Sequence, residues 1–182
     1  MTSFLYDFRA IKTLPRFNLV MRETSSKLKA EEGIYGVWSN VLLPRGTRFG
    51  PIVGKIITPH EVTPDMDRKH FWKIFNKATG GVSFIRDAKD VTVANWMRYV
   101  QPGCGEDQNL VAYQEGQEIY FLAIRQINPN EELLVWYCND YNKRFQSQYE
   151  QRAPQPPPNQ FPVSQYQDVS TMINMPKNID VF

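Results

Sequence analysis

The chain has 182 residues, of which 42% are hydrophobic and 22% are charged, and its formal net charge at pH 7 is +2. This length predicts one ordinary domain with a sizeable core and is too short for two. Because lysine and arginine are interspersed with acidic residues, no basic face for phosphate contacts is evident, and direct DNA binding by this chain is not supported.

The cysteine and histidine content excludes a zinc finger in this chain. Its cysteines are Cys104 and Cys138 and its histidines are His60 and His70, which do not form the paired Cys and His spacing that such a site requires. The sequence begins without a signal segment, and no stretch approaches membrane-spanning length. We therefore expect a soluble intracellular protein with reduced thiols and no membrane partner.

Three regions that differ in amino-acid composition follow one another along the chain. Residues 1–32 mix apolar and charged residues and end in a polar run, which predicts a partly ordered N-terminal arm. Residues 33–148 alternate short apolar runs with Gly, Pro and Asn turn signals, which predicts the folded domain. Residues 149–182 are rich in proline and glutamine and cannot bury enough apolar surface to offset their ordering entropy, which predicts a disordered tail or linker.

The folded domain is predicted to be mostly β with short helices. Gly80-Gly81 between two short apolar runs indicates a hairpin, and a Pro-x-Gly turn at Pro44 interrupts another extended piece. A short helix is expected after residue 138, with Tyr141, Phe145 and Tyr149 on one face. The extended segments predicted in chain order are 33–38, 42–49, 73–75, 82–85, 119–124 and 133–137.

Two segments of the domain resemble the signature segments of PR domains, which are relatives of SET methyltransferase domains. They are Asn95-Trp96-Met97-Arg98-Tyr99-Val100 and Glu132-Leu133-Leu134-Val135-Trp136-Tyr137-Cys138. The segments 44–51, 71–74 and 108–112 also occur in the expected order, so that the resemblance covers roughly residues 14–148. The variants at 46–51 and 136–138, with 14–16 upstream, resemble most the Blimp (B-lymphocyte-induced maturation protein) family of zinc-finger transcriptional repressors.

This resemblance implies a fold and a setting for the chain. The fold would be SET-like, with small curved sheets and a C-terminal strand that threads under a loop as a pseudoknot. The parent protein would be longer and nuclear and would contact DNA through C-terminal zinc fingers absent here, so that this chain would be a fragment or a short isoform. Corepressors and histone-modifying enzymes would be its partners.

The resemblance also implies where a methyl donor would bind. In SET enzymes an Asn-His pair holds S-adenosylmethionine and a tyrosine near the C-terminal strand directs its hydroxyl at the reacting centre. Asn95 and Tyr137 match those positions, but Trp96 replaces the histidine, which removes a ring acceptor and is expected to add bulk at the cofactor. Gln101 and Pro102 stand where PR domains that resemble active enzymes have Asn-Cys, and proline cannot donate a backbone hydrogen bond.

Two hypotheses of different class follow from these residues. The preferred one is a non-catalytic interaction module without a cofactor, in which Asn95, Trp96, Gln101 and Tyr137 line a vestigial S-adenosylmethionine site. The alternative is an S-adenosylmethionine-dependent histone lysine methyltransferase with Tyr137 as its catalytic residue. Tyr137 also has a simpler interpretation as a packed strand tyrosine, and the tryptophans as core aromatics.

Overall fold

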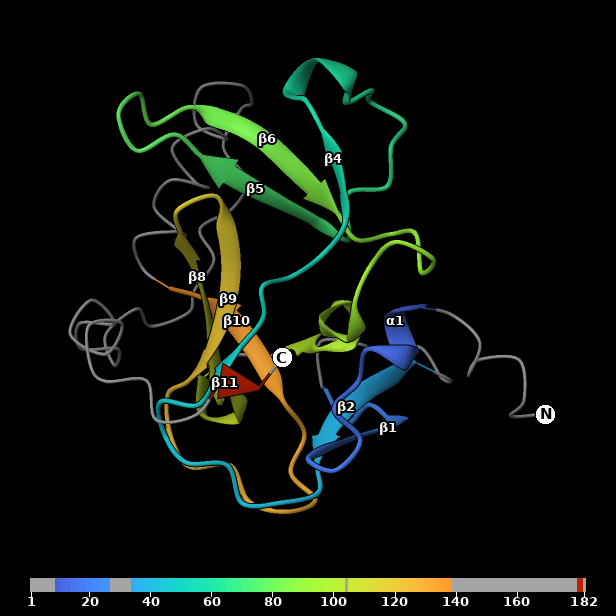
Figure 1. The fold of residues 1–182 in the computed structure, drawn as a ribbon, viewed down its shortest axis with the longest axis vertical. Helices are drawn as coiled ribbons and strands as arrows, with labels where there is room; N and C mark the ends of the chain where they lie inside the picture. The colour runs from blue at the N-terminus through green and yellow to red at the C-terminus, as the bar shows by residue number, and fades with distance from the viewer. Residues whose placement is uncertain (1–8, 27–33, 104, 139–179, 182) are drawn as a thin grey trace.

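A computed structural model describes residues 9–26, 34–103, 105–138 and 180–181 (Figure 1). The helix predicted around Tyr141 and Phe145, Cys104, and all of the predicted tail except two residues lie outside the described residues. Within the described part of the chain, no helix is long and apolar enough to cross a membrane.

Short strands dominate the described residues, which confirms the predicted mostly β class. Four short helical turns accompany them: α1 (Arg9–Lys12), η2 (Pro59–Glu61), η3 (Trp96–Tyr99) and η4 (Gly105–Asp107). The strands are β1 (Leu19–Glu23), β2 (Tyr35–Ser39), β3 (Arg48–Phe49), β4 (Lys55–Ile57), β5 (Phe71–Phe75), β6 (Val82–Asp87), β7 (Gln101–Pro102), β8 (Leu110–Glu115), β9 (Glu118–Ala123), β10 (Leu134–Tyr137) and β11 (Asp180–Val181).

The strands of the described residues form three small sheets. The first pairs β1 with β2, the second has the order β11-β3-β9-β8-β10-β7, and the third has the order β4-β6-β5. In Figure 1 the third sheet lies at the top of the molecule, above the end of the β8–β9 hairpin, and β1, β2 and α1 lie at the lower right. The predicted hairpin is confirmed, because β5 and β6 are antiparallel and Gly80 has a φ of 71° in their connection.

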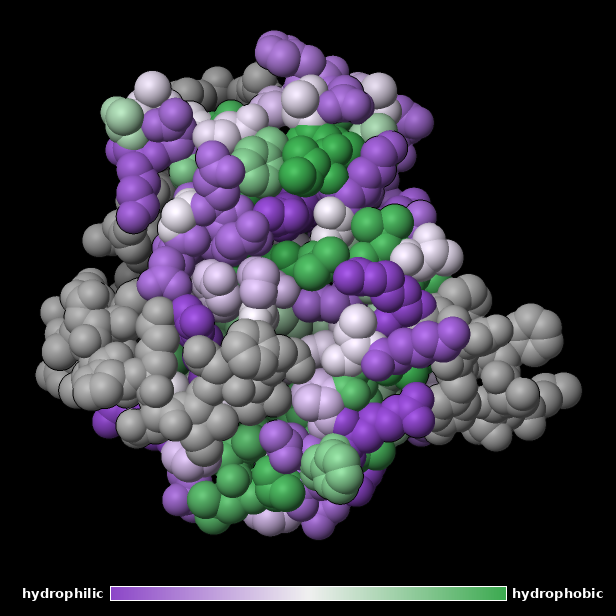
Figure 2. Space-filling view, in the orientation of Figure 1, coloured by the Kyte–Doolittle hydropathy of each residue, from purple (hydrophilic) through white to green (hydrophobic). Residues whose placement is uncertain are grey.

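The core lies against the central sheet. Leu110, Val111, Ala112 and Tyr113 of β8 are each exposed by 3% or less, so that both faces of this strand are covered. A strand buried on both faces reads as a continuous apolar run rather than as an alternating one. On the face shown in Figure 2 polar side chains prevail, and apolar atoms gather over β4, the strand in which Ile56 is exposed, and again at the lower end of the view.

Strand β10 threads through the central sheet. It lies between β7 and β8 and is parallel to both. These two strands follow each other directly in the sequence, and Gly103 begins the short connection between them. The Gly103 N–H donates to the Val135 carbonyl, and a Cβ at Gly103 would lie 2.6 Å from the Cβ of Leu134. Glycine is therefore required at this crossing, and the pseudoknot-like threading that the sequence resemblance implies is present.

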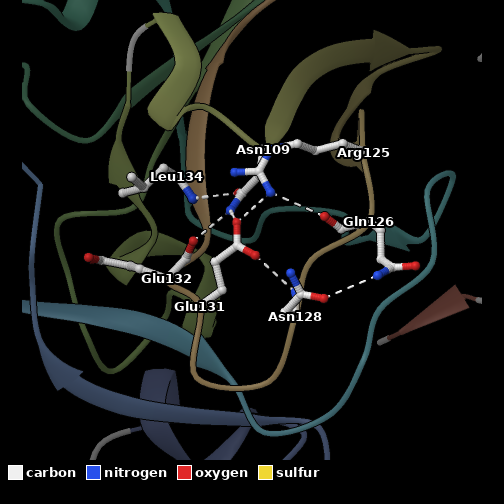
Figure 3. A network of polar contacts seen from close by, with 7 residues as sticks. All are labelled: Asn109, Arg125, Gln126, Asn128, Glu131, Glu132 and Leu134. Carbon is white, nitrogen blue, oxygen red and sulfur yellow. Dashed lines mark hydrogen bonds and ion pairs between the residues drawn. The ribbon is translucent and has the colours of Figure 1, made fainter.

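Asn109 fixes the entry of β10 (Figure 3). Its side chain is buried, its Nδ2 donates to the Glu132 carbonyl at 2.6 Å, and its Oδ1 accepts from the Leu134 N–H at 2.8 Å. The same Nδ2 donates to Oε1 of Glu131, a carboxylate that also binds Arg125 Nη1 at 2.5 Å. One amide thus satisfies backbone groups on both sides of Leu133, the residue that precedes β10.

Glu132 attaches the N-terminal segment to the same place. This carboxylate is 3% exposed and accepts hydrogen bonds from Thr24 Oγ1, Ser25 N and Ser25 Oγ at 2.6–2.7 Å. A Cβ at Gly36 would lie 1.9 Å from Oε1 of Glu132, so that only glycine leaves room for the carboxylate. Because β1 also pairs along all of β2, residues 19–26 of the predicted arm are part of the packed structure. The domain boundary at residue 33 stays a prediction.

We expect Asn109→Ala to lower the free energy of unfolding by about 2–4 kcal/mol, because a buried N–H and a buried C=O lose their side-chain partner. Chemical denaturation monitored by tryptophan fluorescence measures this loss. Asn128→Ala is the matched control, because the Asn128 side chain is exposed and bonds only Gln126 in the network of Figure 3. Equal stability of the two variants would contradict the role given to Asn109.

The Glu131 carboxylate gives the fold a pH dependence. Partial burial favours its neutral form, but the Asn128 N–H, Arg125 and Asn109 outweigh burial and hold its pKa below the usual value. A depressed pKa in the folded state contributes stability above the unfolded pKa, and that stability is lost as the pH falls through the folded pKa. At pH 7 the free energy of unfolding of wild type should exceed that of Glu131→Gln. Chemical denaturation at pH values between about 5 and 3 should show that this difference in unfolding free energy decreases as the pH falls. If the unfolding free energies of wild type and Glu131→Gln changed with pH in the same way, the role given to the Glu131 carboxylate would be excluded.

Candidate functional site

A cavity of about 410 Å³ lies between the small third sheet and the end of β10. The residues around it belong to the start of β2, the start of β5, the turn η3, and the strands β7 and β10. Its volume is within the range of small-ligand sites in proteins. The residues that line it are Ile34, Tyr35, Lys69, His70, Trp72, Met97, Arg98, Tyr99, Val100, Gln101, Pro102, Val135, Trp136 and Tyr137.

Aromatic side chains form one wall of this cavity. The Tyr137 ring, at the end of β10, lies between two tryptophans, with centroid distances of 5.8 Å to Trp72 and 5.6 Å to Trp136. Trp72 in turn packs against the buried ring of Phe121 on β9 at 5.4 Å. These offset and edge-on contacts hold the tyrosine ring in place at the cavity.

Cationic side chains form another wall. Arg98 donates through Nε to the Ala88 carbonyl at 2.8 Å and through Nη2 to the Lys89 carbonyl at 3.3 Å, and its guanidinium lies 4.7 Å from the Tyr99 ring centroid. Nη2 also contacts His70 Nε2 at 3.3 Å. No acidic residue is among the described residues that line the cavity.

Gln101 closes the wall between β2 and η3. Its side chain is 7% exposed, and Nε2 donates to the Tyr35 carbonyl at 2.7 Å and to the Tyr99 carbonyl at 3.1 Å. The following residue, Pro102, has no N–H, and its carbonyl accepts a hydrogen bond from Ser26 Oγ at 2.6 Å. Two backbone acceptors at this wall are therefore engaged by a protein side chain.

The structure separates the four residues that the sequence analysis grouped as a cofactor site. Gln101 and Tyr137 line the cavity, whereas Asn95 and Trp96 do not. The Asn95 side chain donates to the Pro51 carbonyl and accepts from the Val53 N–H, and so holds the segment before β4. Trp96 is 1% exposed, and its ring packs edge-on against Phe49. The Trp96 side chain therefore fills the core, as its simpler interpretation as a core aromatic predicts, and its effect on a bound cofactor stays a prediction.

The sequence analysis gave no site role to Lys69, His70, Arg98 and Tyr99. Arg98 and Tyr99 belong to the first signature segment, whereas Lys69 and His70 precede β5, about thirty residues earlier. The only local signal was the clustering of charged and aromatic residues at 68–72. Their convergence depends on how the third sheet packs. Among the described residues, no group of His, Cys, Asp and Glu is arranged to hold a metal ion.

Comparisons with known proteins agree with the observed fold. A family model described as the PR domain of PR domain zinc finger protein 2 matches residues 20–148. The solved methyltransferase domain of human PR domain-containing protein 2 is similar in structure, with a TM-score of 0.55 and 31% sequence identity over 71% of this chain and 82% of that one.

Curated relatives extend well beyond the matched part. PR domain zinc finger protein 14 of Mus musculus is 35% identical over 138 residues, which cover 72% of this chain and 24% of the relative. PR domain zinc finger protein 4 of Homo sapiens is 37% identical over 142 residues, which cover 76% of this chain and 17% of the relative. The chain therefore spans about a quarter or less of the length of these relatives.

The stability of Gln101 variants should depend on whether the new side chain can donate a hydrogen bond to the Tyr35 and Tyr99 carbonyls. We expect Gln101→Ala to cost about 1–3 kcal/mol of unfolding free energy, because two carbonyls lose a donor, and Gln101→Glu to cost more, because it places a carboxylate against them. Thermal and chemical denaturation at pH 7 test this order. Gln126→Ala, at an exposed glutamine, is the control and should stay within about 0.5 kcal/mol of wild type. A Gln101→Glu variant as stable as wild type would exclude the donor role.

Proposed function

The chain belongs to the PR domain family of SET-related domains, and on that premise we propose that it is a non-catalytic protein-interaction module of a zinc-finger transcriptional repressor. It recruits corepressors and histone-modifying enzymes in the nucleus, while zinc fingers elsewhere in the parent protein contact DNA. The relatives reported above are other members of the family. The narrower assignment to the Blimp type rests on the segments 46–51 and 136–138 and is part of this proposal.

The observation that carries the proposal is the engagement of the cavity wall by Gln101. S-adenosylmethionine has one carboxylate but two cationic groups, a sulfonium and an ammonium, so that its net charge is positive and its cationic groups need acceptors or carboxylates nearby. The Tyr35 and Tyr99 carbonyls already accept from Gln101, and the described lining has Lys69 and Arg98 but no acidic residue. A cavity with this charge disfavours a cationic methyl donor.

A protein lysine methyltransferase is the second candidate. It is favoured by the position of Tyr137, which lies at the cavity between two tryptophan rings. The solved relative with 31% identity is itself described as a methyltransferase domain. The two candidates differ in whether the domain needs the Tyr137 hydroxyl.

The test joins a repression assay to a methyl-transfer assay. The 182-residue chain is fused to a heterologous DNA-binding domain and tethered at a reporter promoter in cells. We expect repression by the wild-type chain and equal repression by Tyr137→Phe, because the ring packing is kept and no hydroxyl chemistry is needed. In parallel, calorimetry with S-adenosylmethionine should show no heat, and radiolabelled S-adenosylmethionine should transfer no label to histone H3.

Two results would overturn this function. Label transfer to histone H3 that is lost in Tyr137→Phe would establish the enzyme instead. The proposed interaction function would also be excluded if the tethered chain were expressed but did not repress the reporter. Cooperative unfolding in vitro would show that the chain is folded.

A further inference from the structure

We propose that the cavity is a docking site for an acidic peptide segment of a partner protein. One Asp or Glu side chain of the peptide binds at the Arg98 and Lys69 side, and a neighbouring apolar side chain packs on Trp136 and Tyr137. This inference rests on the proposed interaction function and gives that function a partner chemistry.

Arg98 supplies a fixed donor for the carboxylate. Its Nε and Nη2 are tied to the carbonyls of Ala88 and Lys89, so that the planar guanidinium is held in one orientation. Within the described part of the chain, Nη1 donates to no protein acceptor. A guanidinium that is already immobilised loses little side-chain entropy on binding, and its charge-assisted hydrogen bonds to carboxylates are among the stronger ones in proteins.

Lys69 adds a second positive charge to the lining of the cavity. Its ammonium group makes no ion pair with the described residues, and the side chain is exposed at the cavity. The nearby Asp67 directs its Oδ1 to the Lys69 backbone N–H at 3.0 Å and does not line the cavity. Among the described residues that line the cavity, Lys69 and Arg98 are cations and none is a carboxylate, and such a lining favours an anionic occupant.

The aromatic wall accounts for the apolar part of the peptide. Trp136 and Tyr137 are only partly buried, and with Ile34 they offer apolar surface beside the charged side. Such a wall tolerates different apolar side chains, because the burial of apolar surface is a non-directional driving force.

A polyanion such as nucleic acid fits the surface less well. Its backbone needs several cations along a track, whereas the net charge of the chain is +2 and its charges are interspersed. An acidic peptide needs only the few cations that meet at this cavity.

Fluorescence polarisation with a defined probe tests the proposal. The probe is a fluorescein-labelled ten-residue peptide of alternating Glu and Leu residues, and the matched probe has Gln in place of Glu. The full 182-residue chain should bind the Glu peptide at least about tenfold more tightly than the Gln peptide. Binding should weaken when NaCl is raised, because salt screens the ionic contacts.

Variants locate the binding on the molecule. Arg98→Gln and Lys69→Gln should each weaken binding of the Glu peptide, by about tenfold for Arg98 and less for Lys69. Lys77→Gln is the matched control, because Lys77 is exposed and lies outside the cavity lining. If Arg98→Gln unfolds because two carbonyls lose their donor, Lys69→Gln carries the test alone, since the Lys69 ammonium makes no ion pair with the described residues.

The outcomes separate this inference from the proposed function. No binding of the Glu peptide, equal binding of both peptides, or binding unchanged in Lys69→Gln would overturn the inference even if the tethered chain represses its reporter. Peptide binding with the expected variant effects, together with methyl transfer to histone H3, would leave the docking site standing and remove the non-catalytic function. Displacement of the peptide by S-adenosylmethionine at an equal concentration would assign the cavity to the cofactor and overturn the inference.

Discussion

The fold depends on the buried Glu132 carboxylate and the Asn109 amide beside it. Burial of a carboxylate is costly unless hydrogen bonds replace its hydration, and here Thr24 and Ser25 supply them. Asn109 bonds the Glu132 carbonyl and the Leu134 N–H, the backbone groups on either side of Leu133. The N-terminal segment, the start of β8 and the start of β10 are therefore held at one place. Because β10 ends at the cavity, the position of its aromatic residues follows from contacts made at its other end.

The cavity combines features that a methyl-transfer site and a peptide-binding site would share. Both need a concave surface with aromatic side chains, and Trp72, Trp136 and Tyr137 provide it. What distinguishes the two is charge. A methyl donor and a lysine substrate both bring positive charge, whereas the described lining supplies Arg98 and Lys69 without a carboxylate. A family fold can thus be kept while the electrostatics of its cavity suit a different occupant, since function belongs to the site and not to the fold.

Sequence reasoning succeeded where structure is set by nearby residues. The β5–β6 hairpin follows from two apolar runs around Gly80, and β9 from a continuous apolar run. It did not predict β1, because Leu19–Glu23 has a weak pattern and its partner β2 lies beyond a polar stretch. Within the first signature segment, Trp96 fills the core while Arg98 faces the cavity. Tertiary packing decides between these two directions, and a contiguous motif does not reveal it. The predicted threading came from family resemblance rather than from any local pattern.

The threading of β10 sets the order in which the chain can fold as it is synthesised. Strands β7, β8 and β9 leave the ribosome before β10, yet β10 occupies the place between β7 and β8. Strands β7 and β8 must therefore remain apart, or separate again, until residues 134–137 have emerged, whereas β8 and β9 can already pair. Pairings between distant segments form slowly because loop closure must precede them. A nascent chain that stops short of Tyr137 exposes the edges of β7 and β8, so that the last signature segment also completes the sheet and removes a surface prone to aggregation.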